Sequence, residues 1–185
     1  MVTLYIIPGY GEKTSDQGYL ELVQAGKQKG YRVVEVNPTW ERNTIDKWLN
    51  EFNSVVEENE HSESVVVGFS FGAYICALSS ANHHFKKIIF CSLSPYFKDD
   101  IGKLPAKATT LFGKRRINAF SKYEFPASIN IPAIFMVGSA DIPLVIERVK
   151  KSYNKWSGEK KLNVVKDAPH DISHPEYIKA LIERI

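Results

Sequence analysis

Six short apolar runs, separated by segments of helical length, are the feature that most restricts the fold of this chain. The runs are rich in Val, Ile and Phe and span 2–7, 31–36, 64–69, 86–92, 132–138 and 161–166. In most of them the apolar residues are continuous rather than alternating with polar ones, which is typical of parallel strands covered on both faces. Repeated strand–helix–strand units predict a six-stranded parallel sheet in a three-layer α/β/α sandwich with right-handed crossovers.

The segments between the runs carry apolar residues at helical spacing. One stripe, preceded by Asn43 or Thr44 as a candidate N-cap, contains Ile45, Trp48, Leu49, Phe52 and Val56. A second stripe contains Val145, Val149, Tyr153 and Trp156. The final helix is predicted to begin at Pro175 and to bury Tyr177, Ile178, Leu181, Ile182 and Ile185. Helices are therefore expected on both faces of the sheet.

The size and charge of the chain argue against several classes of protein. Its 185 residues fit a single domain over 1–185, and a net charge of +3 is too small to indicate a nucleic-acid or membrane partner. No apolar run approaches the roughly 20 residues of a membrane-spanning helix, and the N-terminus has no secretory signal pattern. Cys76 and Cys91 lie in segments expected to be buried, so we expect no disulfide and a cytoplasmic protein.

Residues 94–130, between the fourth and fifth runs, form a connection much longer than the loops that usually join such elements. The segment contains seven basic and three acidic residues together with six aromatic ones. Long connections at the carboxyl edge of a parallel sheet often build the walls of a substrate site. The segment is therefore either a crossover with one or two short helices packed on the sheet, or part of a substrate site as well.

Gly68-Phe69-Ser70-Phe71-Gly72 has the spacing G-x-S-x-G, directly after a predicted strand and before a predicted helix over 73–81. A sharp strand-to-helix turn of this kind holds a serine hydroxyl above the sheet edge, and the flanking glycines leave room for the helix to turn back over the strand. The helix N-terminus also directs backbone N–H groups to the same point. Ser70 is therefore a candidate nucleophile; the alternative is a glycine-rich turn with a helix-capping serine.

A serine nucleophile needs a base, and the chain has five histidines: His61, His83, His84, His170 and His174. Only the last two follow the carboxyl end of a predicted strand. His174 directly precedes Pro175, which predicts a helix-start residue. His170 is therefore the candidate base, with a solvated loop histidine as the alternative, and the other three are expected at the surface.

Asp141 is the candidate acid that orients this histidine, because it lies between the fifth strand and a helix beginning near Pro143. The alternative for Asp141 is a helix N-cap. The order serine, aspartate, histidine along the chain, each after a strand, suits a triad assembled on one sheet edge. Asp167 and Asp171 are reserve candidates, although both lie very near His170 in sequence.

With these motifs the chain resembles the α/β-hydrolase superfamily over nearly its whole length, and most of all the small lidless serine esterase-like members. It looks like a reduced version without the first antiparallel strands and without a large cap domain. The resemblance implies the strand order 2-1-3-4-5-6, with Ser70 as nucleophile, His170 as general base and Asp141 as the orienting acid.

The same resemblance implies an oxyanion hole made of two backbone N–H groups. One belongs to Phe71, directly after the nucleophile, and the other to Tyr10, in the loop after the first strand. The sequence departs from the family at this loop, where Pro8-Gly9 stands in place of the usual His-Gly.

The activity implied is hydrolysis of a carboxylic ester or thioester through an acyl-enzyme, with a small-molecule acyl substrate and no metal or organic cofactor. The alternative is a non-catalytic binding protein that retains the hydrolase scaffold and uses 94–130 as an interaction surface.

Two phosphate-binding patterns are incomplete in this sequence. Gly9-x-Gly11 follows the first strand and Glu35 lies on the second, as in a dinucleotide site, but Thr14 occupies the third glycine position. A phosphate loop is disfavoured because Glu12 lies between Gly11 and Lys13.

Metal and nucleic-acid binding are also disfavoured. Pro175 makes it unfavourable for His170 and His174 to share a helix face as metal ligands. Lys114-Arg115-Arg116 is a short basic run of the kind usually found on a solvated surface.

Overall fold

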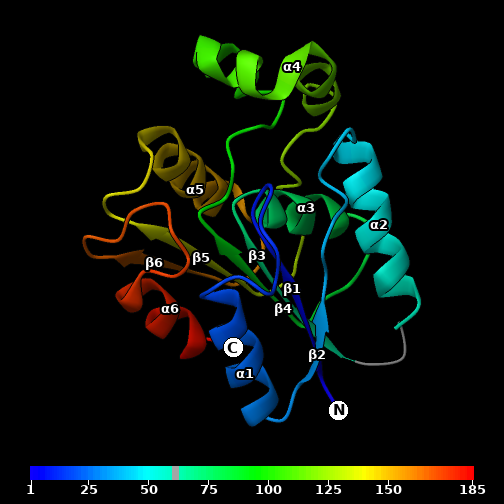
Figure 1. Ribbon diagram of the computed structural model, residues 1–185, viewed down its shortest axis with the longest axis vertical. Helices are drawn as coiled ribbons and strands as arrows, with labels where there is room; N and C mark the ends of the chain where they lie inside the picture. The colour runs from blue at the N-terminus through cyan, green and yellow to red at the C-terminus, as the bar shows by residue number, and fades with distance from the viewer. Residues whose placement is uncertain (60–62) are drawn as a thin grey trace.

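The computed structural model describes residues 1–59 and 63–185 and shows one sheet of six parallel strands between layers of helices (Figure 1). The strands lie in the order β2-β1-β3-β4-β5-β6. Their bounds are β1 Thr3–Ile7, β2 Arg32–Glu35, β3 Ser64–Phe69, β4 Lys87–Cys91, β5 Ala133–Gly138 and β6 Lys160–Val165. Each bound lies within one residue of the predicted run, so the predicted fold class and strand order are confirmed.

Five helices pack on the two faces of the sheet, and each face has its own apolar core. On one face lie α1 (Tyr19–Gln28) and α6 (Pro175–Ile182). On the other lie α2 (Ile45–Glu57), α3 (Phe71–Ser79) and α5 (Pro143–Lys155). The central strands β1 and β3 are buried at every residue, whereas the edge strands β2 and β6 are partly exposed because each has only one neighbouring strand.

Two helix ends differ in detail from their predictions. Thr44 occupies the N-cap position of α2, but its hydroxyl donates to Asp46 at 3.0 Å and caps no backbone N–H. The helix after Ser70 begins at Phe71, two residues before its predicted start. Pro175 begins α6 as predicted.

The segment 94–130 forms a short 3-10 helix, η1 (Ile101–Lys103), and the helix α4 (Ala106–Phe120), which lies beyond the carboxyl ends of the strands (Figure 1). Gly113 interrupts α4 with φ 73° and ψ 159°, a conformation that glycine adopts without a Cβ penalty. The helix is therefore two short halves joined at an angle. The first half, 106–112, buries only Ala108 and Phe112.

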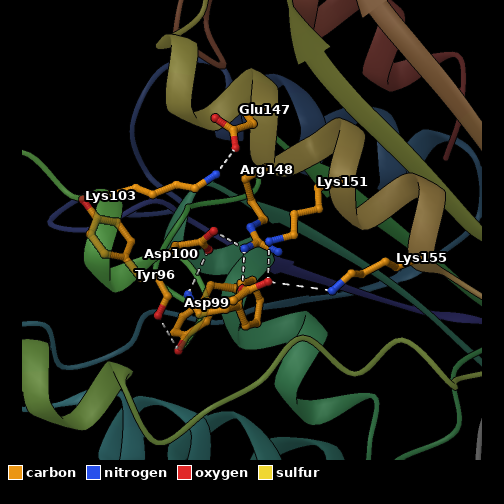
Figure 2. A network of polar contacts seen from close by, with 10 residues as sticks. Tyr96, Asp99, Asp100, Lys103, Glu147, Arg148, Lys151 and Lys155 are labelled. Atoms are coloured by element: carbon orange, nitrogen blue, oxygen red, sulfur yellow. Dashed lines mark hydrogen bonds and ion pairs between the residues drawn. The ribbon is translucent and has the colours of Figure 1, made fainter.

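The start of this segment is fastened to α5 by a buried cation, as Figure 2 shows. Arg148 is 1% exposed and donates to Asp99 at 2.7 Å and to Asp100. Its guanidinium carbon lies 5.1 Å from the centre of the Phe97 ring. Lys151 adds a second donor to Asp99. Because a buried charge is costly without partners, this cluster fixes where the chain leaves the sheet.

Among the described residues, none of the helices combines the length and apolar character needed to cross a membrane. Cys76 and Cys91 are both buried and carry free thiols.

Candidate active site

Ser70 lies at the sharp turn between β3 and α3, in the strand–serine–helix order predicted from the motif. Its backbone is strained, with φ 54° and ψ −111°, in a region that L-residues rarely occupy. A Cβ at Gly68 would collide with the backbone of Gly72, and one at Gly72 would collide with the carbonyl of Ile7. Both glycines are thus required for α3 to turn back over the sheet.

The structure brings the three predicted side chains together at the carboxyl edge of the sheet. The Nε2 atom of His170 lies 3.0 Å from the Ser70 hydroxyl, and its Nδ1 atom lies 2.7 Å from Asp141 Oδ1. Ser70 and Asp141 are 8% and 4% exposed, while His170 is half-buried. Ring contact with Phe69, at 5.0 Å between centres, supports the imidazole from one side.

The hydrogen bonds assign the protons in this chain of residues. An ionised carboxylate only accepts, so Nδ1 of His170 carries the proton and donates to Asp141. Nε2 is then the acceptor, and the Ser70 hydroxyl donates to it. Asp141 also accepts from the Ile142 backbone at 2.6 Å, which fixes its orientation.

The two reserve carboxylates lie elsewhere. Asp171 accepts hydrogen bonds from the backbone and hydroxyl of Ser173, and Asp167 is exposed. Neither has a hydrogen bond to His170.

The remaining histidines take no part in this arrangement. His174 is the N-cap residue of α6, consistent with its position before Pro175. His84 is exposed and His83 is half-buried. His61 lies outside the described residues.

Sequence reasoning did not identify two serines at the end of β4. Ser92 donates to Asp141 Oδ2 at 2.7 Å and lies 3.0 Å from the hydroxyl of Tyr177, whose pKa is raised by burial. Ser94 lies 3.1 Å from the hydroxyl of Ser70. The available signal was the Ser92-x-Ser94 pattern at the end of the fourth run, since β4 lies next to β3 in the sheet.

A pocket of about 380 Å³ opens beside Ser70 and His170. Most of its wall is apolar and comes from two places: residues 94–112 and residues 142–145. The apolar side chains contributed by these segments are Pro95, Tyr96, Leu104, Pro105, Ala108, Leu111, Phe112, Ile142, Leu144 and Val145. The long connection therefore contributes directly to the cavity next to the serine.

Comparison with solved structures finds close likeness in fold at low sequence identity. Alpha/beta hydrolase domain-containing protein 10 from mouse superposes with a TM-score of 0.83 at 13% identity, over 98% of this chain and 87% of that one. Est1E from Butyrivibrio proteoclasticus gives 0.83 at 14%, over 98% and 84%. A monoacylglycerol lipase from Paleococcus ferrophilus gives 0.75 at 17%, over 98% and 92%. This chain has the α/β-hydrolase fold. No protein-family model and no curated protein matches the sequence.

Within the α/β-hydrolase fold, the two backbone groups expected to bind an oxyanion both border the pocket. They are the N–H groups of Tyr10, after β1, and Phe71, at the first position of α3. Among the described residues neither N–H donates to a protein acceptor. Both N–H groups are therefore unpaired within the described part of the chain and belong to residues that line the cavity.

The loop after β1 is shaped without the histidine that the α/β-hydrolase pattern usually has there. The backbone N–H of Gly9 donates to Glu12 Oε2 at 3.0 Å and to the Tyr19 hydroxyl at 2.9 Å. Tyr19 in turn donates to Glu12 at 2.5 Å, and burial raises the pKa of this phenol. A Cβ at Gly9 would collide with the Glu12 carboxylate, so the glycine leaves room for it.

Arg116, on the second half of α4, connects this helix to the same loop. It donates to the Tyr10 hydroxyl at 2.7 Å and to the carbonyls of Trp40 at 3.0 Å and Asn43 at 2.8 Å. Its guanidinium carbon lies 5.4 Å from the centre of the Tyr10 ring. One side chain thus links α4, the loop after β1 and the start of α2.

Proposed function

We propose that this protein is a serine hydrolase that cleaves a carboxylic ester or thioester through an acyl-enzyme. The observation that carries the proposal is the continuous chain of hydrogen bonds from Ser70 through His170 to Asp141. Ser70 and His170 border a mainly apolar pocket. A serine hydroxyl by itself is a weak nucleophile at neutral pH, and a base held by a carboxylate activates it.

In the first half of the reaction the Ser70 oxygen attacks the acyl carbonyl carbon while His170 Nε2 takes its proton. The imidazolium that forms is stabilised by Asp141. The bond to the leaving alcohol or thiol then breaks, and His170 returns the proton to that group. In the second half His170 removes a proton from water, the hydroxide attacks the acyl carbon, and the acid leaves as Ser70 regains its proton.

The negative charge on the carbonyl oxygen would be held by the N–H groups of Phe71 and Tyr10. A fixed donor of this kind contributes about 3 kcal/mol to transition-state stabilisation. Because both donors are backbone groups, the side chains of Tyr10 and Phe71 affect this stabilisation of the oxyanion only through the position of the loop and helix.

The substrate we propose is a small acyl ester or thioester whose acyl or aryl group is apolar. Support comes from the lining of the pocket by residues 94–112 and 142–145, which contribute mainly apolar side chains. A protein with the same fold is described as a monoacylglycerol lipase, an enzyme named for an ester substrate. The segment 94–130 then belongs to the single domain 1–185 as part of its substrate site.

The test is hydrolysis of three substrate sets: p-nitrophenyl esters of increasing acyl length, acyl-CoA thioesters and peptide amides. Wild-type protein should hydrolyse members of the first or second set, and Ser70→Ala and His170→Ala should lower kcat/KM by about a thousandfold or more. His84→Ala, a change of an exposed histidine, should leave it unchanged. Folded wild-type protein without activity on any set would favour a non-catalytic binding role.

A further inference from the structure

We propose that Ser94 is a further catalytic residue, whose hydroxyl donates to the oxygen of Ser70 and speeds release of the acyl group from the enzyme. This inference rests on the proposed function. It assigns a role to a side chain that touches the reacting atom but lies outside the triad.

The position of Ser94 is fixed by the backbone on both sides of the nucleophile. The N–H of Ser70 donates to the carbonyl of Cys91 at 2.8 Å, and the N–H of Ser94 donates to the carbonyl of Ser70 at 3.4 Å. The end of β4 is therefore fastened to the turn that carries Ser70. Ser94 is 2% exposed, borders the pocket, and has its hydroxyl 3.1 Å from that of Ser70.

The direction of this hydrogen bond follows from the count of protons. Ser70 has a single hydroxyl proton, which it donates to His170 Nε2. The bond between the two serines must then be donated by Ser94. Among the described residues the Ser94 hydroxyl has no other hydrogen-bond partner, so its proton is available for the Ser70 oxygen in every step.

The strength of the hydrogen bond from Ser94 to the Ser70 oxygen changes along the reaction. In the free enzyme the Ser70 oxygen belongs to a hydroxyl, a good acceptor that already receives the bond from Ser94. In the acyl-enzyme the same oxygen belongs to an ester and is a poor acceptor. As the acyl carbon–oxygen bond breaks, Ser70 takes both electrons of that bond while His170 transfers its proton to the same oxygen. Negative charge builds on the Ser70 oxygen during this transfer, and a hydrogen bond to an oxygen that carries more charge is stronger.

The hydrogen bond from Ser94 therefore strengthens greatly between the acyl-enzyme and the deacylation transition state. It strengthens less between the free enzyme and the acylation transition state, because it is already strong in the free enzyme. Only an interaction that strengthens toward a transition state accelerates that step. Loss of the Ser94 hydroxyl should slow deacylation more than acylation.

The experiment measures both steps with p-nitrophenyl acetate. Pre-steady-state release of p-nitrophenolate gives acylation, and rapid quench with mass spectrometry follows decay of acetylated Ser70. In Ser94→Ala we expect deacylation to fall about tenfold, the scale of a hydrogen bond to a charged group, while acylation changes by about threefold or less. Ser94→Cys, with a weaker donor of similar size, should shift the balance in the same direction.

Ser79→Ala is the matched control. It also removes a buried hydroxyl that has a hydrogen bond, to Asn53 at 2.8 Å, but at the far end of α3. Both rate constants should stay near wild type in this variant. Equal slowing of the two steps in Ser94→Ala, or no slowing of either, would overturn the role assigned to Ser94.

Labelling by a fluorophosphonate separates this result from failure of the proposed function. If wild-type Ser70 is labelled and Ser94→Ala is labelled at a similar rate, the nucleophile is active in both and the deacylation result decides the inference. If folded wild-type protein is not labelled, the proposed function fails, and the role of Ser94 with it.

Discussion

Two regions meet at the carboxyl edge of the sheet and are held in place by different means. The region around Ser70, His170 and Asp141 is built from short turns directly after β3, β5 and β6 and is joined by hydrogen bonds among hydroxyls, an imidazole and a carboxylate. The covering segment 94–130 is long, and two guanidinium groups fasten it at separate points.

Under the proposed function, the region around Ser70 would carry the chemistry and the segment 94–130 would set the acyl specificity. Strand ends are rigid because each is hydrogen-bonded to its neighbours, so they hold reacting atoms in place. Between its attachments at Arg148 and Arg116, the first half of α4 rests on the pocket through Ala108 and Phe112. Leu111 there is 64% exposed. Five of the seven residues of this half are exposed, so fewer contacts fix it than fix the strand ends.

The largest expected effect concerns the attachment at Arg148. Arg148→Ala leaves the buried Asp100 carboxylate without its cation, and loss of one partner of a buried pair costs about 3–5 kcal/mol in the free energy of unfolding. Urea denaturation measures this difference.

Lys103→Ala is the control, because it breaks the ion pair with Glu147, in which both side chains are about half exposed. Its free energy of unfolding should stay close to wild type. Equal destabilisation by the two substitutions would show that the buried cation does not fix the segment.

The second prediction concerns the loop after β1. Glu12→Gln replaces the charged acceptor of Gly9 N–H and Tyr19 by a neutral one, which weakens two hydrogen bonds. If these bonds hold the Tyr10 N–H in position, kcat for ester hydrolysis should fall about tenfold while KM changes little. Steady-state kinetics and a thermal melt are the measurements.

Glu35→Gln serves as the matched control for this substitution. Glu35 is exposed and lies 4.0 Å from Lys27, away from the pocket. A fall in kcat in both variants, or in neither, would show that Glu12 does not position the loop after β1 for catalysis.

The third prediction tests whether the segment 94–130 selects substrates by the length of their acyl chain. Leu111→Ala removes apolar surface at the rim of the pocket, so kcat/KM for longer p-nitrophenyl esters should fall about threefold to fivefold, on the scale of one buried methylene. The acetate ester should be hydrolysed at the wild-type rate.

Leu20→Ala, an exposed leucine on α1 that does not border the pocket, should change neither rate. Loss of activity in Leu111→Ala that is the same for all acyl lengths would contradict a role in binding the acyl chain.

The smallest expected effect is a pH dependence of stability at Asp99. Burial by itself raises the pKa of this carboxyl, but hydrogen bonds from Lys151 and Arg148 lower it to about 2. Because the pKa is lower in the folded state than the usual value of about 3.9, Asp99 stabilises the fold above about pH 4, and this contribution is lost as the pH falls toward 2.

Asp99→Asn should therefore show a shallower loss of unfolding free energy over that pH range than wild type. Burial raises the pKa of the adjacent Asp100, which contributes with the opposite sign, so the difference between the two proteins is the informative quantity. Identical pH profiles from urea denaturation would contradict the contribution of Asp99.

The sequence predicted the strands and the positions of Ser70, His170 and Asp141 because both depend on local patterns: apolar runs and the residues that end them. The contacts of Ser92 and Ser94 depend on which strands are neighbours. Ser94 reaches Ser70 because β4 lies beside β3, and Ser92 reaches Asp141 because β4 lies beside β5. A single strand pattern does not contain that information.

Arg148 could not be distinguished from the basic residues around it for a similar reason. It lies on a helix with other lysines, a pattern typical of a solvated face, and it is buried only because Asp99 and Asp100 come from a distant segment. The same holds for Glu12, whose role depends on Tyr19 and on the space left by Gly9.

The most direct test of the central claim is labelling of the protein by a fluorophosphonate, with the modified residue located by mass spectrometry. If His170 and Asp141 activate Ser70, wild-type protein carries a single adduct on Ser70, Ser70→Ala carries none, and His170→Ala is labelled much more slowly. Folded wild-type protein that is not labelled, or that is labelled equally fast without the imidazole of His170, would contradict this activation.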